Sequence, residues 1–190
     1  MKFNATGTGF VGYPNLPAPV TSGGTQGFLD STGEQWVANP LINNGKWSRA
    51  RDALYFRWYR AAAYSPPGAA TVFTYDSATR DAYQLFTNTT FTAPVQGWWE
   101  FRTQSGFNST AVGQSLRQQL VATLVGTPIQ VSASINMSGG AGSITAMATT
   151  LIWMSQNDTM VAQYFASATG FTGMVGSNLA WIEGAYRGTG

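Results

Sequence analysis

Residues 91–101, Phe-Thr-Ala-Pro-Val-Gln-Gly-Trp-Trp-Glu-Phe, predict a loop that turns sharply into an amphipathic β-strand. Pro94 can end the loop with a fixed φ, and Gly97 allows the chain to turn tightly into the strand. Because side chains alternate along a strand, Trp99 and Phe101 share one face. We expect that face to be buried, since each ring contributes about 4–6 kcal/mol of burial before entropy is subtracted. The opposite face then carries Trp98, Glu100 and Arg102.

Short runs of aromatic and β-branched residues recur after Lys46, separated by Gly, Pro, Asn and Asp, and this pattern is typical of strands joined by turns. Strands are predicted over residues 54–63, 70–75, 97–104, 116–125, 129–136, 144–154, 159–166 and 179–186. Their spacing leaves no room for crossover helices and favours an antiparallel sandwich or barrel. Residues 115–124, SLRQQLVATL, also fit a helix, and the inward parity of the strand after Asp158 is open.

The first 46 residues differ from the rest in being dense in Gly, Pro, Asn and Thr. Four prolines forbid a long helix, yet the segment holds too many apolar residues for a solvated linker. We therefore predict an extended N-terminal anchoring arm over residues 1–46 and a sandwich domain over residues 47–190. Two interpretations of the arm stay open, because it could wrap its own domain or dock on another subunit.

Composition excludes much of enzymology. The 190 residues contain no Cys and no His, which removes disulfides, thiolate nucleophiles, imidazole bases and zinc sites built on these side chains. Only 9% of the residues are charged. Lys occurs only at Lys2 and Lys46, so no basic stripe predicts nucleic-acid binding. Polar residues interrupt every apolar run, and the opening residues lack an export signal, so we expect neither membrane insertion nor secretion.

Two patterns in the sequence superficially match catalytic or cofactor-binding motifs. Residues 7–12 fit the dinucleotide pattern G-x-G-x-x-G, but they lack the preceding strand and following helix that the pattern requires. The eight carboxylates are scattered, so a hydrolase built on a carboxylate pair is the weaker interpretation. No acidic cluster predicts a calcium site. We expect no catalytic residues, no cofactor and no metal.

Residues 91–101 resemble the F-T-A-P-V-x-G-x-Y-x-F signature of the complement-q globular head, a relative of the tumour necrosis factor jelly roll. Residues 57–76 are similar to the opening strands of the form found in bacteriophage virion proteins, and residues 178–188 to the closing strand that pairs beside the first. Trp99 replaces the usual Tyr, and Asn157 stands where Gly is usual. The resemblance implies an all-β, antiparallel jelly-roll β-sandwich. Its core signature comprises Phe91, Pro94, Gly97, Trp99 and Phe101.

The same resemblance implies a homotrimer packed through the sheet that holds the first and last strands. The candidate trimer-interface residues are Phe56, Trp58, Tyr164 and Trp181, although ordinary core positions are the alternative for all four. We expect a non-enzymatic structural protein of a phage virion, attached to capsid or tail through residues 1–46. The alternative is a receptor-binding module, in which Trp and Tyr rings and amide side chains recognise a host-surface polysaccharide.

Overall fold

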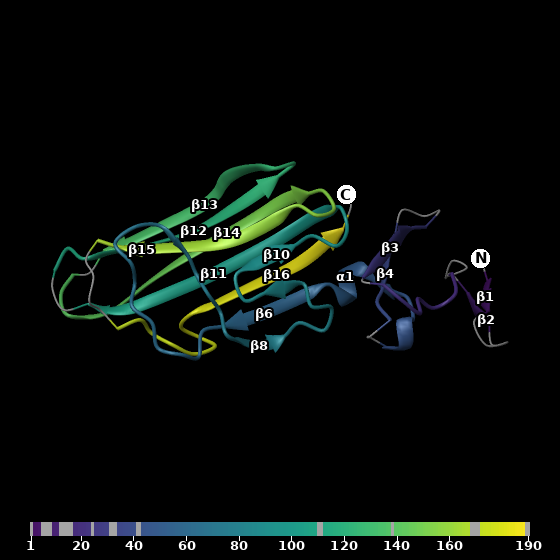
Figure 1. Cartoon of the computed structure of the whole chain (residues 1–190), viewed down its shortest axis with the longest axis horizontal. Helices are drawn as coiled ribbons and strands as arrows, with labels where there is room; N and C mark the ends of the chain where they lie inside the picture. The colour runs from purple at the N-terminus through teal and green to yellow at the C-terminus, as the bar shows by residue number, and fades with distance from the viewer. Residues whose placement is uncertain are drawn as a thin grey trace.

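Two antiparallel β-sheets pack face to face and form most of the chain, as Figure 1 shows for the computed structural model. The structure describes residues 2–4, 9–11, 17–23, 25–30, 34–40, 43–109, 112–137, 139–167 and 172–188. Every strand pair is antiparallel. The predicted all-β jelly-roll sandwich is confirmed.

One sheet, named here the β12 sheet, contains in spatial order β13 (Thr127–Met137), β12 (Ser115–Leu124), β15 (Thr159–Ala166), β10 (Thr90–Thr92) and β9 (Phe86–Thr87), with β7 (Thr71–Val72) paired to β15. The other, the β11 sheet, contains β14 (Gly142–Met154), β11 (Gly97–Ser109), β16 (Trp181–Gly188), β6 (Tyr55–Tyr59) and β8 (Ser77–Arg80). The closing strand β16 therefore lies between β11 and β6, beside the first strand of the sandwich.

The segment that also fitted a helix is strand β12. Its inward positions alternate Leu116, Gln118, Leu120 and Ala122, all fully buried. Gln118 is satisfied inside the sandwich, because its amide nitrogen donates to Thr103 at 3.2 Å and its oxygen accepts from Ser105. A buried, hydrogen-bonded glutamine thus takes a place that an apolar residue usually fills in a half-buried strand. The parity of β15 is also settled: Met160 and every second residue after it point inward.

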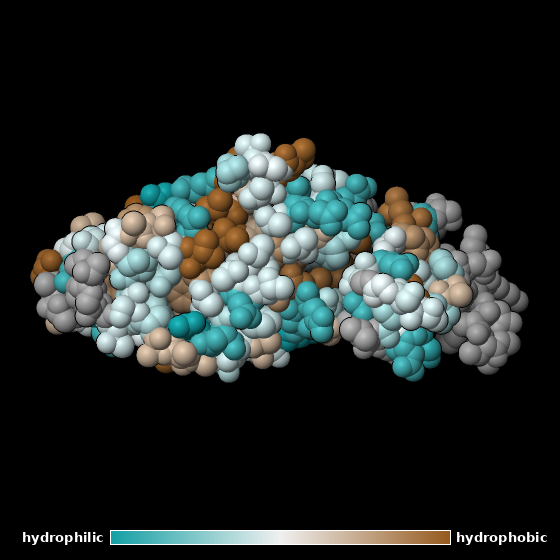
Figure 2. Space-filling model, in the orientation of Figure 1, coloured by the Kyte–Doolittle hydropathy of each residue, from teal (hydrophilic) through white to brown (hydrophobic). Residues whose placement is uncertain are grey.

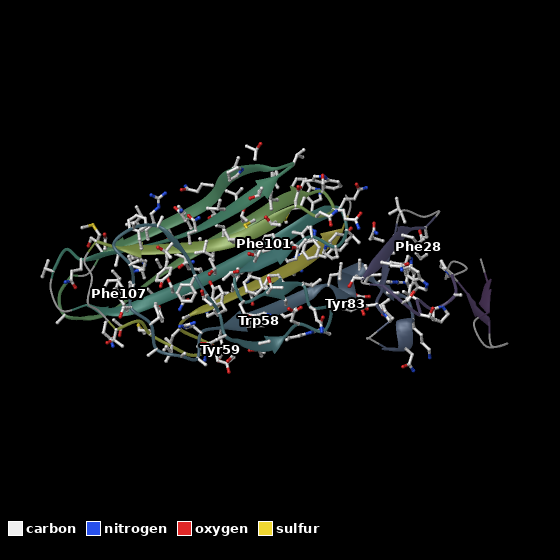
Figure 3. The ribbon with its side chains drawn as sticks, in the orientation of Figure 1. Phe28, Trp58, Tyr59, Tyr83, Phe101 and Phe107 are labelled. Atoms are coloured by element: carbon white, nitrogen blue, oxygen red, sulfur yellow. The ribbon has the colours of Figure 1, made fainter. Side chains whose placement is uncertain are left out.

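The core between the sheets is built from aromatic rings. Trp99 and Phe101 are fully buried and contact Phe91 with ring centroids 4.6 and 5.0 Å apart. Phe101 lies in the middle of the sandwich in Figure 3, whereas Phe107 lies towards its far end, in a smaller cluster with Leu116. Gly97, at φ 146°, leaves room for Tyr186, whose ring would lie 2.5 Å from an added Cβ. Pro94 is half-buried in the loop before β11.

The N-terminal segment adds further short elements. A small sheet, named here the N-terminal sheet, consists of β3 (Gln26–Leu29), β4 (Gln35–Ala38) and β5 (Ser48–Arg49). The other N-terminal elements are a hairpin of β1 (Lys2–Asn4) and β2 (Gly9–Val11), the 3-10 turn η1 (Asn43–Gly45) and the short helix α1 (Ala50–Ala53). Of the G-x-G-x-x-G match, residues 9–11 form β2 and the others lie outside the described residues.

Part of this segment, from β4 to α1, packs on the chain's own sandwich. Val37, Ala50 and Leu54 are fully buried in the same core cluster as Trp99. The backbone N–H of Tyr186 in β16 donates to the carbonyl of Leu54 at 3.0 Å. Because β5 belongs to the N-terminal sheet, that sheet crosses residue 46, the boundary predicted from composition. Among the described residues, no helix is long and apolar enough to cross a membrane.

Candidate functional site

Four large apolar side chains are exposed together on the outer face of the β11 sheet. They are named here the apolar patch: Trp98 (40% exposed), Met147 (48%), Leu151 (58%) and Trp153 (38%). All four lie on β11 or β14 at positions that alternate with buried residues. Contiguous exposed apolar surface on a soluble protein commonly marks a contact with another molecule.

Strand register brings the members of the patch together. Trp98 lies directly opposite Trp153, and their rings meet edge to face with centroids 5.8 Å apart and an interplanar angle of 80°. Leu151 lies opposite Glu100, and Met147 lies opposite Gln104. The patch therefore follows β14 along one border of the sheet.

Charged side chains occupy the rest of the same face, on β11, β16 and β6. They are named here the charged network: Arg57, Glu100, Arg102, Glu183 and Arg187. The guanidinium of Arg187 donates through Nε to Glu100 at 2.8 Å, and Arg102 donates to the same carboxylate at 2.8 Å. Arg102 also lies 4.0 Å from Glu183, which accepts from Arg57 at 3.0 Å. The five charges form one continuous chain of ion pairs.

The network changes the ionisation of its members. The hydrogen bond from Arg187 lowers the pKa of Glu100, and the hydrogen bond from Arg102 lowers it further. Partial burial raises the pKa but does not offset these bonds, so the pKa of Glu100 stays below its ordinary value. The Tyr55 hydroxyl donates to Glu183 at 3.1 Å. Burial raises the pKa of Tyr55, and the negative charge of Glu183 raises it further. A general acid needs a raised carboxyl pKa, so the lowered pKa of Glu100 suits an ion-pairing role and not proton donation.

Three other acidic residues, Asp76, Asp81 and Asp158, accept hydrogen bonds from backbone N–H groups. Asp158 accepts from the N–H groups of Val125 at 2.9 Å and Ser155 at 2.7 Å, which fixes the turn before β15. Asp81 accepts from two backbone N–H groups and from the Trp58 indole. Asp76 accepts from two backbone N–H groups as well. Within the part of the chain that the structure describes, no three acidic side chains gather as metal ligands would.

Three of the four trimer-interface candidates pack towards the chain's own core, which is the alternative that the sequence left open for all four. Phe56 is fully buried, stacked between Phe86 and Phe91, and has no surface to offer a neighbour. Tyr164, on the β12 sheet, packs inward against Phe73 with centroids 4.4 Å apart. Trp58 packs partly buried against the same core, and its indole donates to Asp81 at 2.9 Å.

The fourth candidate, Trp181, does lie on the outer face of the β11 sheet. Its register partner Gln104 points outward, but the ring itself is only 9% exposed. The guanidinium of Arg57 covers it at 4.6 Å from the ring centroid. The charged network therefore shields this ring, and the apolar patch supplies the exposed apolar side chains of the face.

The patch could have been found from parity alone at one position. Trp98 is predicted outward by the alternation with Trp99 and Phe101, so its exposure needed no structure. The partners on β14 could not be found in this way, because they meet Trp98 only through the long-range pairing of β11 with β14. No signal in the sequence marks Leu151 or Met147 as exposed.

Comparison with known proteins gives the fold and nothing finer. No protein-family model and no curated protein matches the chain. Among solved structures, it is similar to the globular domain of zebrafish complement 1qA, with 15% identity and a TM-score of 0.57 over 72% of this chain and 98% of that one. Murine APRIL gives 9% identity and a TM-score of 0.57 over 70% and 98%. The Eiger tumour necrosis factor from S. frugiperda gives 6% identity and 0.53 over 72% and 94%. Residues 1–190 thus contain a jelly-roll sandwich of the complement-q and tumour necrosis factor type.

Proposed function

We propose that this chain is a non-enzymatic structural protein of a bacteriophage virion, which forms a homotrimer through the outer face of its β11 sheet. The observation that carries the proposal is the apolar patch, since Trp98, Leu151 and Trp153 lie exposed beside one another on one sheet face. Burial of such rings against sister chains removes apolar area from water without any change in the fold.

A second copy of the chain is the occupant that the face suits best. The apolar patch supplies an interface core, and the neighbouring charged network supplies a polar border with complementary charges. The resemblance to the complement-q head implies a trimer with this sheet towards the axis. The face of the molecule in Figure 2 is mostly white and teal, with brown in a band across its middle and in smaller patches.

The virion setting is supported by the resemblance of residues 57–76 to phage virion proteins. Residues 1–46 would attach the protein to capsid or tail. β1 and β2 lie at one extreme of the long axis of the molecule, beyond the N-terminal sheet (Figure 1). An attachment made there leaves the outer face of the β11 sheet accessible to sister chains.

Sedimentation equilibrium of the full chain tests the self-association. We expect a trimer at micromolar concentration, and a monomer for Leu151→Glu, because a carboxylate in the apolar patch would be buried without a partner. Ile135→Glu is the matched control: Ile135 is 59% exposed, as Leu151 is 58%, but it lies on the β12 sheet. If the wild-type chain sediments as a monomer at this concentration, the proposed homotrimer is wrong.

The attachment has a separate test. Mass spectrometry of purified particles of the encoding phage should detect the chain. Removing residues 1–16 leaves β3, β4 and the buried Val37 in place. We expect the shortened chain to remain a trimer and to be missing from particles. If it enters particles as well as the full chain does, residues 1–16 are not the attachment.

Recognition of a host-surface polysaccharide is the second candidate function. One observation outside the β11 sheet favours it: a buried glutamine faces a groove at the end of the sandwich. That observation is independent of self-association.

A further inference from the structure

A groove lies at the junction between the N-terminal sheet and the loops at the adjoining end of the sandwich. Its walls are β3, Gln35 of β4, residues 94–96 before β11, and Gln156 in the turn between β14 and β15. It encloses about 220 Å³. This is below the ~300–1,000 Å³ of sites for drug-sized ligands, so the groove suits a single ring-sized group.

Gln35 is the feature of the groove that calls for a ligand. Its side chain is carried on the short strand β4 and is only 9% exposed, and its amide lines the groove. The amide nitrogen lies 3.0 Å from the point where Gly27 would carry a Cβ, directly beside β3. The amide atoms themselves are not among the solvent-excluded, unpartnered atoms of the described residues, so they are open to the groove and can be reached by water or by a ligand hydroxyl there. The open side of Gln35 faces the groove.

Two more glutamines complete the polar lining. Gln156 donates its amide nitrogen to the carbonyl of Pro94 at 3.1 Å, which fixes its position and leaves its side-chain oxygen free to accept. Gln96 has an exposed side chain, and its carbonyl accepts from the Tyr186 hydroxyl at 3.2 Å, which fixes the loop that carries it. Three amides thus border one small space, and each amide group has both donors and an acceptor.

An apolar surface stands beside these amides. Phe28 of β3 lines the groove and is held edge to face against Trp47, with ring centroids 5.0 Å apart. Figure 3 shows Phe28 on the N-terminal sheet, away from the rings of the main core. Val95 forms part of the opposite wall, and an added Cβ on Gly27 would come within 2.6 Å of it. The two walls are therefore packed closely at the position of Gly27.

The chemistry of the lining selects the ligand. None of the described residues of the lining is charged, so an ionic ligand would lose its hydration there without finding a counter-charge among them. Amides that both donate and accept suit vicinal hydroxyl groups, and an aromatic side chain suits the C–H face of a pyranose ring. An extended peptide would need a longer channel with pockets for alternate side chains. We propose that this groove binds one neutral sugar residue of a polysaccharide, with Gln35 as the buried hydrogen-bonding group.

Titration by NMR tests the proposal on the full chain. The probes are the methyl glycosides of glucose, galactose, mannose and N-acetylglucosamine, at millimolar concentrations because a ring-sized ligand binds weakly. We expect at least one glycoside to shift the side-chain amide signals of Gln35 and Gln156. A capped neutral peptide rich in Val and Thr serves as the competing probe.

Gln35→Met keeps the volume of the side chain and removes its amide. We expect the affinity for the glycoside to fall about tenfold or more, while the melting temperature stays level or rises, because the amide is open to water in the groove. Gln119→Met is the matched control: Gln119 is 7% exposed and donates to Gln163 at 2.6 Å, far from the groove. It should lower the melting temperature and leave the glycoside affinity unchanged.

A second variant keeps the test decisive if Gln35→Met fails to fold. Gln96→Ala, on the exposed loop, then replaces it and should also weaken the glycoside affinity. The proposal is overturned if no glycoside shifts the groove signals, if the peptide alone does so, or if both variants bind the glycoside as the wild-type chain does. A monomeric chain that still binds the glycoside contradicts the proposed trimer and leaves this site standing.

Discussion

Trp98 and Trp153 form a cross-strand pair on the outside of the sandwich, with ring centroids 5.8 Å apart and planes at 80°. Both rings are more than one-third exposed in the single chain. Two neighbouring tryptophans of this kind are costly to leave in water and stabilise a contact that covers them. Their place on the β11 sheet is the basis of the first prediction.

Replacing either tryptophan of the pair should weaken self-association more than folding. We expect Trp98→Ala and Trp153→Ala each to raise the dissociation constant of the oligomer by tenfold or more. The double variant should show a coupling energy of about 0.5–1.5 kcal/mol, since the rings contact each other. Sedimentation equilibrium of the four chains measures both quantities. Additive effects would mean that the two rings act separately.

Adjacent tryptophans on opposite faces should respond differently. Trp99 is fully buried against Phe91 and Tyr186, so Trp99→Ala should lower the free energy of unfolding by about 3–5 kcal/mol. Trp98→Ala removes a side chain of the same size from the surface, and its effect on monomer unfolding should stay within about 1 kcal/mol. Urea unfolding of both variants makes the comparison. Equal losses would contradict the assignment of faces.

The charged network should make stability depend on pH in the acid range. The hydrogen bonds of Arg187 and Arg102 hold the pKa of Glu100 below its ordinary value in the folded chain. Such a carboxyl group stabilises the fold fully above its unfolded pKa of about 4.3, and this contribution is lost as pH falls through the lower folded pKa.

Urea midpoints between about pH 6 and about pH 3 test this dependence. The wild-type chain should lose stability towards the acid end, and Glu100→Gln should be less stable at neutral pH but fall less steeply. Identical slopes for the two chains would show that Glu100 contributes nothing to the acid sensitivity.

Gly184 should tolerate no side chain. A Cβ at this position in β16 would lie 2.3 Å from the Phe56 ring and 3.0 Å from the Phe101 ring. We expect Gly184→Ala to lower the free energy of unfolding by about 1–3 kcal/mol, as overpacked cores do. Gly139→Ala is the control, since a Cβ there meets nothing within 4 Å. Equal unfolding midpoints for the two variants would show that the core can shift at no cost.

Much of the fold could be predicted because most strands carry a local signal. The strand over residues 159–166 matches β15 at both ends, and the inward positions Trp99 and Phe101 follow from alternation. Residues 115–124 fitted both a strand and a helix because the polar Gln118 occupies a buried position. Its hydrogen-bond partners, Ser105 and Thr103, lie on the opposite sheet, and no local sequence pattern reveals them. Burial of an amide is a tertiary property.

The candidate site was harder to predict, for the same reason. Phe56 looked like surplus apolar surface, yet Gly184 on the neighbouring strand leaves the space that its ring fills. The N-terminal sheet was missed because β5 has two residues, and β3 and β4 have four each among turn-forming neighbours. The groove depends on that sheet, so the place of Gln35 in its lining could not be inferred from sequence.

The seating of Val37, Ala50 and Leu54 within the main core has a mechanical consequence. A load applied to β4 reaches the sandwich directly, because Val37 of β4 is buried in the main core beside Leu54, whose carbonyl accepts from the backbone N–H of Tyr186 in the closing strand. Tension on the N-terminal sheet would therefore pull on the interior of the domain. Resistance to shear at this junction would limit the force that the N-terminal sheet can transmit.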